Sequence, residues 1–419
     1  MHVELIHSAR GGREAESLKT LMAKCVHCGF CNATCPTYRV SGDEREGPRG
    51  RIYLLKQMLE GGPAGGATRS SLDHCLHCQS CETNCPSGVA FGEIIDKGRQ
   101  YGEQHLPKRS GLERTLRTSL PVFLGYPQTL SLLLHLIRPF RFLFPTRFRP
   151  YLQTPRVKLK PITTEGAQGH VLLLEGCAEP VFQPNVQAAL RILLHRLGYQ
   201  VHVAHGATCC GALRYHLGDQ EGARKEIRQN IEAFEPYLSG TLPEFQGKEV
   251  KAILVSSSGC GAMVGDYTRI CAEDEAWAES AHRVSERFSD PLSFLESHVE
   301  ELRAMLQPEG ETLMLHEPCT LRHGLKLKGR LSRFLTNVGI SHYCDAEPDL
   351  CCGAGGSNAI LYPETSRRLR ETKLEALQHP DGKPLIRVSS NIGCMMHLST
   401  PNQPVFHWLE VLATRLTIA

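Results

Sequence analysis

The sequence has no excess of charge of either sign. Its 419 residues include 47 Lys and Arg against 44 Asp and Glu, a formal net charge of +3. So balanced a chain lacks the basic field typical of nucleic-acid-binding proteins, and we expect no nucleic-acid partner. The shares of apolar (41%) and charged (22%) residues exclude wholesale disorder. The length predicts two or three domains.

The N-terminus lacks the apolar segment of a secretory signal. It carries Glu4, Arg10, Arg13, Glu14 and Glu16 instead. We therefore expect a cytoplasmic protein, in which disulfides rarely persist. Cysteine supplies 18 of the 419 residues, too small a share for a disulfide scaffold. Metal binding or redox chemistry is the better interpretation of so many cysteines in a reducing compartment.

One stretch lacks charged residues altogether. No Asp, Glu, Lys or Arg lies between Thr118 and Ile137, and Arg138, Arg141, Arg147 and Arg149 follow. The length would just span a bilayer, but prolines, glycine and polar residues interrupt it. A helix pair packed on a neighbouring domain is favoured. Contact with a membrane surface, with arginines near anionic headgroups, is an alternative.

The second half alternates short apolar runs with helical patterns. Apolar runs predict strands at 170–174, 200–203, 251–256, 312–315 and 386–389. Helical spacing predicts helices at 185–197 and 331–338. Such alternation predicts parallel sheets covered by helices.

Cysteine spacing shows that this half is an internal repeat. Cys177 and Cys209 are 32 positions apart, as are Cys319 and Cys351. The second cysteine of each pair begins a Cys-Cys-Gly triplet, and a Gly-Cys pair follows later, at Cys260 and at Cys394. Two duplicated lobes are the simplest explanation.

The first hundred residues contain a different motif, also twice. Cys25-Val-His-Cys28-Gly-Phe-Cys31-Asn-Ala-Thr-Cys35-Pro and Cys75-Leu-His-Cys78-Gln-Ser-Cys81-Glu-Thr-Asn-Cys85-Pro both read C-x2-C-x2-C-x3-C-P. This spacing is typical of [4Fe-4S] clusters. Zinc also binds four thiolates, but it rarely needs three cysteines in one short loop and a fourth before proline.

The motif assigns eight cysteines to two clusters. In two-cluster ferredoxins the cysteine before proline binds the other cluster. The first cysteine set is therefore Cys25, Cys28, Cys31 and Cys85, and the second cysteine set is Cys75, Cys78, Cys81 and Cys35. Two neighbouring clusters predict an electron relay. Basic residues near the first motif would offset the negative charge of such assemblies, although solvated surface is the simpler interpretation for most of them: Lys24, Arg39, Arg45, Arg49, Arg51 and Lys56.

These stretches resemble a known family. CVHCGFCNATCPTY, DEREGPRGRIYLLK and HCLHCQSCETNCPSGV are closely similar to the iron–sulfur subunit of glycolate oxidase. The Cys-Cys-Gly repeats resemble the cysteine-rich domains of that subunit, of heterodisulfide reductase and of lactate-utilisation proteins. The resemblance covers nearly the whole chain.

The resemblance implies an electron-transfer subunit. A separate FAD-binding subunit would oxidise glycolate to glyoxylate, and this chain would pass the electrons to quinone or another membrane acceptor at the inner face of the cytoplasmic membrane. Equivalent subunits for D-lactate or glycerol 3-phosphate, and a heterodisulfide-reductase-like thiol enzyme, are the alternatives. No catalytic residue is identified. The cluster Gly353-Ala-Gly355-Gly356 follows a cysteine pair rather than opening a dinucleotide-binding unit, which favours a tight turn.

The lobes depart from the family's fullest pattern, C…C-C-G…C-x-x-C. Ser257 and Asn391 stand where the first cysteine of each C-x-x-C is expected. Each lobe keeps four cysteines, which are Cys177, Cys209, Cys210 and Cys260 in the first and Cys319, Cys351, Cys352 and Cys394 in the second. A further cluster or zinc, a thiol site and unligated buried cysteines are the three interpretations.

Three residues near the lobe cysteines are further candidate ligands, and two cysteines lie outside every motif. His316, Glu317 and His397 are possible auxiliary ligands, and Cys271 and Cys344 are expected to be ordinary packing cysteines.

The sequence thus predicts an α+β protein. A helical, ferredoxin-like domain with two clusters spans 1–110, and an apolar and basic linking region spans 111–165. Two α/β cysteine-rich lobes follow, at 166–305 and 306–419.

Overall fold

The computed structural model describes residues 1–143, 168–307, 310–379, 381–383 and 385–417. The chain forms two compact units, each assembled from three segments. The first unit comprises Met1–Ser119, Leu213–Gln220 and Glu347–Glu375. The second unit comprises Leu120–Ala212, Glu221–Ala346 and Ala376–Ala419.

The first unit contains no strand among its described residues. Its N-terminal segment forms η1 (His7–Ala9), α1 (Arg13–Ala23), α2 (Phe30–Thr34), α3 (Pro36–Ser41), η2 (Glu44–Glu46), α4 (Pro48–Leu59), α5 (Gly66–Asp73), α6 (Ser80–Thr83), α7 (Phe91–His105) and most of α8 (Gly111–Gly125). The later segments add most of α12 (Ala212–His216), α20 (Asn358–Leu361) and most of α21 (Pro363–Ala376).

The two cysteine motifs of this unit have the same local structure. A helix, α1 or α5, leads into the cysteine loop, and a short helix, α2 or α6, follows it. Leu18 and Met22 of α1, Leu55 of α4 and Ile94 of α7 are fully buried in one core. α1 packs against α7, and α2 packs against α6. The core therefore holds the two cysteine loops next to each other.

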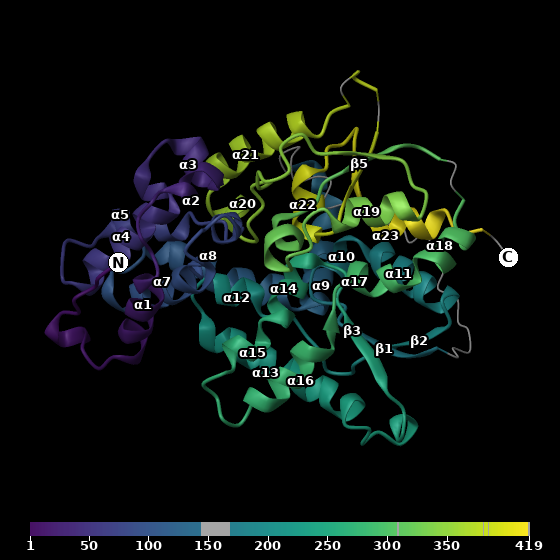
Figure 1. Ribbon diagram of the computed structural model, residues 1–419, viewed down its shortest axis with the longest axis horizontal. Helices are drawn as coiled ribbons and strands as arrows, with labels where there is room; N and C mark the ends of the chain where they lie inside the picture. Colours follow the sequence, from purple (N-terminus) through teal and green to yellow (C-terminus); the bar gives the residue numbers. More distant parts are fainter. Residues whose placement is uncertain (144–167, 308–309, 380, 384, 418–419) are drawn as a thin grey trace. The chain divides into compact units, whose positions relative to one another are not determined.

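The second unit contains two four-stranded parallel sheets (Figure 1). One has the order β2-β1-β3-β4 and the other the order β6-β5-β7-β8. The strands are β1 (Gly169–Leu173), β2 (Tyr199–Val203), β3 (Val250–Leu254), β4 (Phe288–Ser289), β5 (Leu313–Leu315), β6 (His342–Cys344), β7 (Ile386–Ser389) and β8 (Val405–His407). The same order in both sheets agrees with a duplication.

This unit also contains helices, several of which form the crossover connections that parallel strands require. Those of the first half of this unit are α9 (Pro127–Ile137), η3 (Arg138–Leu143), α10 (Glu179–Phe182), α11 (Pro184–Arg196), α13 (Gln220–Leu238), η5 (Pro243–Phe245), α14 (Ser258–Gly265), α15 (Tyr267–Ile270), α16 (Ala278–Arg287), α17 (Pro291–Leu295), η6 (Glu296–His298) and α18 (Val299–Met305). Those of its second half are η7 (Thr320–Gly324), α19 (Arg330–Asn337), α22 (Ile392–Leu398) and α23 (Trp408–Thr414).

The predicted α+β class is confirmed, and so are the five predicted strands and two predicted helices. β4, β6 and β8 were not predicted. All three lie at sheet edges, and none is a continuous apolar run: β4 has two residues, β6 reads HYC and β8 reads VFH.

The charge-free stretch forms a pair of helices, as expected. Among the described residues, no single helix is long and apolar enough to cross a membrane, and only the bent pair Gly111–Gly125 and Pro127–Phe140 meets that length and composition. α9 buries Leu130 and Leu134 against Val181. Leu132 and Leu136 are exposed. Arg147 and Arg149 lie outside the described residues.

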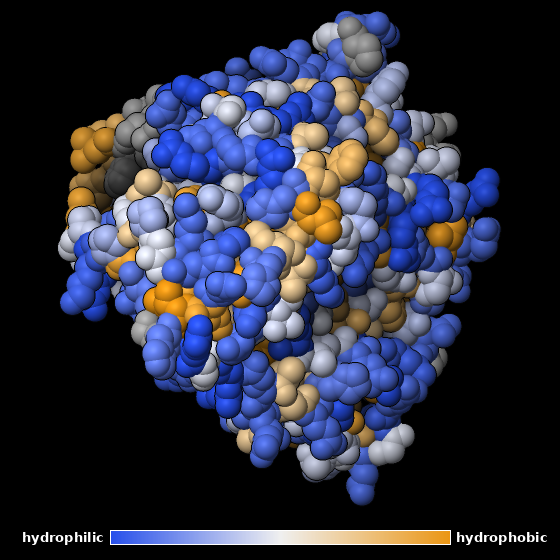
Figure 2. Space-filling view, turned by 60° about the vertical axis from the view of Figure 1, so that its left-hand side comes forward, coloured by the Kyte–Doolittle hydropathy of each residue, from blue (hydrophilic) through white to orange (hydrophobic). Residues whose placement is uncertain are grey.

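Exposed apolar side chains continue beyond α9. Phe140, Phe142 and Leu143 of η3 are exposed as well. On the face drawn in Figure 2, hydrophobic residues form separate patches on a largely hydrophilic surface.

Candidate metal centres

Both cysteine loops of the first unit bend at the same two motif positions. The residues before and after the middle cysteine have left-handed backbones, with φ of 57° at His27 and 85° at Gly29 in the first loop. The second loop repeats this at His77 (52°) and Gln79 (57°). Left-handed residues turn the chain sharply. The two-residue spacers therefore curl so that three thiols line one cavity.

Two cavities of the first unit are lined by the predicted cysteine sets. Cys25, Cys28, Cys31 and Cys85 line the first cavity together with Cys81. Cys35, Cys75, Cys78 and Cys81 line the second cavity. Because Cys81 borders both, the two cavities are neighbours. The structure thus brings together the four members of each set, and their assignment as ligands stays a prediction.

The two sets differ in exposure to solvent. All four members of the second set are buried. In the first set Cys28 is exposed and the other three are half-buried. Val26 and Phe30, on either side of Cys28, are 68% and 67% exposed. The first cavity is therefore the one closer to the surface.

The pKa values of the cysteine thiols indicate whether a metal fits these cavities. Burial raises the pKa of Cys31 to about 11, and the neighbouring Cys25 and Cys28 add to the shift. Burial, and then the charges of Cys78, Cys75, Cys35 and Cys31, raise the pKa of Cys81 well above its usual value. Such crowded thiols resist ionisation unless a cation stabilises them. The donor set therefore fits an iron–sulfur cluster, and also zinc.

Basic residues around the first motif differ in burial. Lys24, Arg39 and Arg45 are exposed, and Arg49 and Lys56 are half-buried. The Arg51 side chain is buried beside the second cavity. Surface solvation therefore describes most of this group but not Arg51.

A triad of side chains centred on the buried Asp96, beside the second set, has no signal in the sequence. His77 Nε2 lies 2.9 Å from Asp96 Oδ2, and His216 Nδ1 lies 3.3 Å from Asp96 Oδ1. Burial opposes protonation of His77, but the charge of Asp96 outweighs it and raises the pKa of His77. Their potential ligand atoms lie within 4.8 Å of one another, as a metal site would require. Hydrogen bonds to Asp96 already account for both rings, and we interpret the triad as an anchor for the second loop.

The four cysteines of the first lobe also come together. The Cys209 side chain interacts with those of Cys177 and Cys210, and Cys210 also interacts with Cys260. The contact with Cys209, followed by burial, raises the pKa of Cys177 well above its usual value.

Buried polar groups surround this thiol cluster. Asn230 Nδ2 donates to the Cys209 carbonyl at 2.8 Å, and Tyr267 Oη donates to the Cys210 carbonyl at 2.9 Å. These bonds fix the Cys-Cys backbone, so the first lobe has a preformed four-thiol site.

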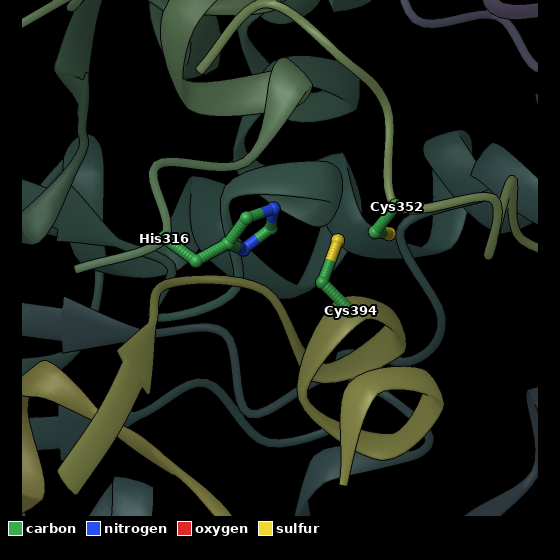
Figure 3. A group of neighbouring side chains, drawn as sticks. All are labelled: His316, Cys352 and Cys394. Atoms are coloured by element: carbon green, nitrogen blue, oxygen red, sulfur yellow. The ribbon is translucent and has the colours of Figure 1, made fainter. Parts of the chain in front are cut away.

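The cysteines of the second lobe are divided between the units. Cys319 and Cys394 belong to the second unit, and Cys351 and Cys352 to the first. Cys394 on α22 and His316 after β5 point toward one another (Figure 3), and their ligand atoms lie within 4.8 Å. The His316 Nδ1 atom is 3.0 Å from Ser389 Oγ.

The other predicted auxiliary ligands have different surroundings. Glu317 accepts from Arg322 Nη1 at 2.8 Å and from the backbone of Gly329 at 3.0 Å. His397 is half-buried on α22. Cys271 is buried, as expected, but Cys344 is exposed at the end of β6, so its interpretation as a packing cysteine was wrong.

Ser257 and Asn391, which replace the missing cysteines, form hydrogen bonds between the two lobes. Asn391 Nδ2 donates to Ser258 Oγ of the first lobe at 3.5 Å and to Thr320 Oγ1 of its own lobe at 3.1 Å. Asn391 Oδ1 accepts from the backbone of Gly393 and so caps α22. Ser257 Oγ accepts from the Ile392 backbone at 3.4 Å. The two departures from the cysteine pattern therefore have a structural role.

Two families of domains match the chain. Residues 21–89 match the 4Fe-4S dicluster domain. Residues 171–265 and 313–399 match the cysteine-rich domain.

Several curated proteins are similar to the chain. The glycolate oxidase iron-sulfur subunit of Escherichia coli (strain K12) is 39% identical over 99% of both chains. The probable glycolate oxidase iron-sulfur subunit of Bacillus subtilis (strain 168) is 28% identical over 90% of this chain and 88% of its own. Lactate utilization protein A of the same strain is 25% identical over 58% of this chain and 99% of its own.

Proposed function

The chain belongs to the family of glycolate oxidase iron-sulfur subunits, and from this premise we propose that it carries electrons within a complex that oxidises glycolate. The arrangement of two four-cysteine sets around adjacent cavities is the observation that supports the proposal most directly. A separate FAD-binding subunit would oxidise glycolate to glyoxylate. A membrane quinone or another acceptor would receive the electrons.

Each residue set has a defined part in this proposal. Cys25, Cys28, Cys31 and Cys85 would hold one [4Fe-4S] cluster, and Cys75, Cys78, Cys81 and Cys35 would hold the other. When bound, such clusters supply one-electron transfer. The exposed Cys28 edge, with Val26 and Phe30 beside it, offers a redox partner close access to the first set. The triad of His77, Asp96 and His216 would keep the second loop in place.

Iron analysis of the full chain, purified without oxygen, tests this proposal. We expect a brown protein with about eight irons in the two ferredoxin-type sites. Cys28→Ser should lower the iron content and change the EPR spectrum of one cluster, whereas Cys344→Ser, at an exposed cysteine outside all motifs, should leave both unchanged. A colourless protein loaded with zinc would contradict the proposal.

The partner flavoprotein would bind the substrate, so the identity of the substrate is tested in the complex. After co-purification with the flavoprotein, dye reduction with glycolate is compared with dye reduction with D-lactate. The match to lactate utilization protein A keeps D-lactate as the alternative. Reduction by D-lactate alone would exclude glycolate as the substrate.

We further propose a cytoplasmic location and contact with the inner membrane surface through α9 and η3. Exposed apolar side chains and nearby arginines suit the interface of a bilayer with anionic headgroups. In flotation with vesicles containing anionic lipid, Leu132→Gln combined with Leu136→Gln should reduce binding. Phe406→Gln, which removes an exposed apolar side chain of β8, is the matched control. Equal binding of all variants would contradict this contact.

A separate proposal concerns metal binding by the cysteines of the two lobes. Cys177, Cys209, Cys210 and Cys260 would hold a further cluster or zinc, and in the second lobe Cys394, with His316 beside it, would be a ligand of the corresponding centre. Cys210→Ser in the full chain should then remove metal without changing the spectra of the ferredoxin-type clusters. Unchanged metal content would favour free thiols. The four-part division at residues 110, 165 and 305 stays a proposal about sequence modules.

A further inference from the structure

Arg51 lies in the wall of the second cavity. It lines this cavity together with all four cysteines of the second set. Its side chain is 1% exposed. A guanidinium stays charged in proteins, so this position places a permanent positive charge beside the predicted ligands.

Hydrogen bonds hold the guanidinium in one orientation. Nε donates to the Ser71 carbonyl at 2.7 Å, and Nη2 donates to Thr37 Oγ1 at 3.1 Å and to Glu46 Oε2 at 3.0 Å. Nη1 points at Cys35 Sγ, 3.9 Å away. The charge is therefore directed at a sulfur of the second set.

Glu46 compensates this charge only in part. Its side chain is 18% exposed, and its other oxygen lies 2.9 Å from His74 Nδ1. A buried charge is costly unless a counter-charge lies nearby. The thiolate of Cys35 would be such a counter-charge. By contrast, Arg49 at the first cavity is 36% exposed and pairs with the half-exposed Glu44.

We propose that Arg51 raises the reduction potential of the cluster held by Cys35, Cys75, Cys78 and Cys81. Reduction adds one electron, and so one negative charge, to the cluster. A fixed positive charge beside a ligand sulfur stabilises that reduced state, because net charge and hydrogen bonds to the sulfurs set the potential. The inference rests on the proposed function and adds a residue that sets the potential without being a ligand.

The test is an EPR-monitored redox titration of both clusters in the full chain. Arg51→Met should shift the reduction equilibrium of the second cluster at least tenfold toward the oxidised form, which is about 59 mV for one electron. The first cluster of the same variant should shift less than twofold. Arg39→Met removes an exposed arginine four residues after Cys35 and should change neither cluster by more than twofold.

Two further variants keep the test decisive if Arg51→Met loses its second cluster. Glu46→Gln removes the opposing charge and should shift the equilibrium toward the reduced form. Arg51→Lys keeps the charge and should stay within threefold of the parent. An unchanged or opposite shift in Glu46→Gln would overturn the inference, as would Arg51→Met with full iron and no selective shift.

Iron content separates this inference from the proposed function. A parent chain without iron overturns the proposed function. A fully loaded chain whose second cluster does not respond to these substitutions overturns only the role of Arg51.

Discussion

At the scale of single residues, the two cysteine loops adopt the same left-handed backbone conformation with different amino acids. Gly29 and Gln79 occupy the same motif position and both have a left-handed backbone. Glycine adopts this conformation without strain, whereas other residues carry a conformational cost. A Cβ at position 29 would also lie 2.7 Å from Arg49 Nη1, the mobile end of a side chain.

Exchanging these residue types tests the strain. Gly29→Ala should destabilise the folded chain by about 1–2 kcal/mol. Gln79→Gly should change stability by less than about 0.5 kcal/mol, because relief of strain offsets the greater flexibility of the unfolded chain. Anaerobic thermal unfolding measures both. A loss in Gln79→Gly as large as that in Gly29→Ala would contradict the argument.

The buried Asp290 should make the stability of the folded chain depend on pH, independently of the metal sites. Its buried carboxyl caps α17 by accepting from the Leu292 backbone at 2.9 Å. Burial raises the pKa of Asp290 to about 7. The folded chain then holds this proton more tightly than the unfolded chain, whose carboxyl titrates near pH 4. This group therefore costs the folded state stability as the pH rises from about 4 to about 7.

Asp290→Asn removes that cost and keeps an oxygen at the cap. The variant should be stabilised relative to the parent more at pH 8 than at pH 5, by at most roughly 1.4 kcal/mol for each unit of the pKa shift. Asp43→Asn, at a cap of η2 that faces solvent, should show no larger gain at pH 8. A gain in Asp290→Asn that is equal at both pH values would contradict the buried charge.

At the scale of elements, the Asn391 side chain both caps a helix and bonds the other lobe, and two variants can separate these contributions to stability. It caps α22 with its carbonyl and bonds the first lobe with its amide. Asn391→Asp keeps the cap but loses the donor, and Asn391→Ala loses both. We expect losses of about 1 kcal/mol and about 2–3 kcal/mol respectively in thermal or denaturant unfolding. Equal losses would show that the cap contributes nothing, and an Asn391→Asp variant as stable as the parent would show that the amide's bonds contribute nothing.

Local pattern explains which elements the sequence predicts. β1, β3, β5 and β7 are the central strands of the two sheets, and β1, β3 and β5 each contain three consecutive buried apolar residues, a pattern that the sequence shows. The cysteine spacing likewise predicts three thiols of each cavity, because it fixes loop geometry over a few residues. The fourth follows from the rule that the cysteine before proline binds the other cluster. His216 and Arg51 were beyond prediction as neighbours of the second set. His216 reaches the second set through packing between segments distant in the sequence. Arg51 is one of several basic residues near the first motif, and the sequence does not distinguish the buried one from the exposed ones.

At the scale of the whole molecule, the first unit depends on segments from far along the chain. Arg99 Nη1 donates to the His216 carbonyl at 2.9 Å, Asn358 Nδ2 donates to the His74 carbonyl at 3.4 Å, and Arg117 bonds Tyr362. A fragment ending at Ser119 would lose these three interactions.

The fragment 1–119 should therefore hold less iron and unfold at a lower temperature than the same unit in the full chain. Iron analysis and anaerobic thermal unfolding measure the difference. His216→Ala in the full chain, which removes the imidazole partner of Asp96 but keeps the carbonyl that Arg99 bonds, should lie between the two. A fragment with about eight irons and an unchanged unfolding temperature would show that the later segments are dispensable.

The segmented first unit also has a consequence for biosynthesis. At roughly 5–20 residues per second, the ribosome needs on the order of 10–50 s to extend the chain from Ser119 to Glu375. During that interval both cysteine motifs have been synthesised, but Glu347–Glu375 has not. The nascent protein therefore exposes both cysteine motifs in an incomplete first unit, and we expect iron to be inserted late in translation or after release.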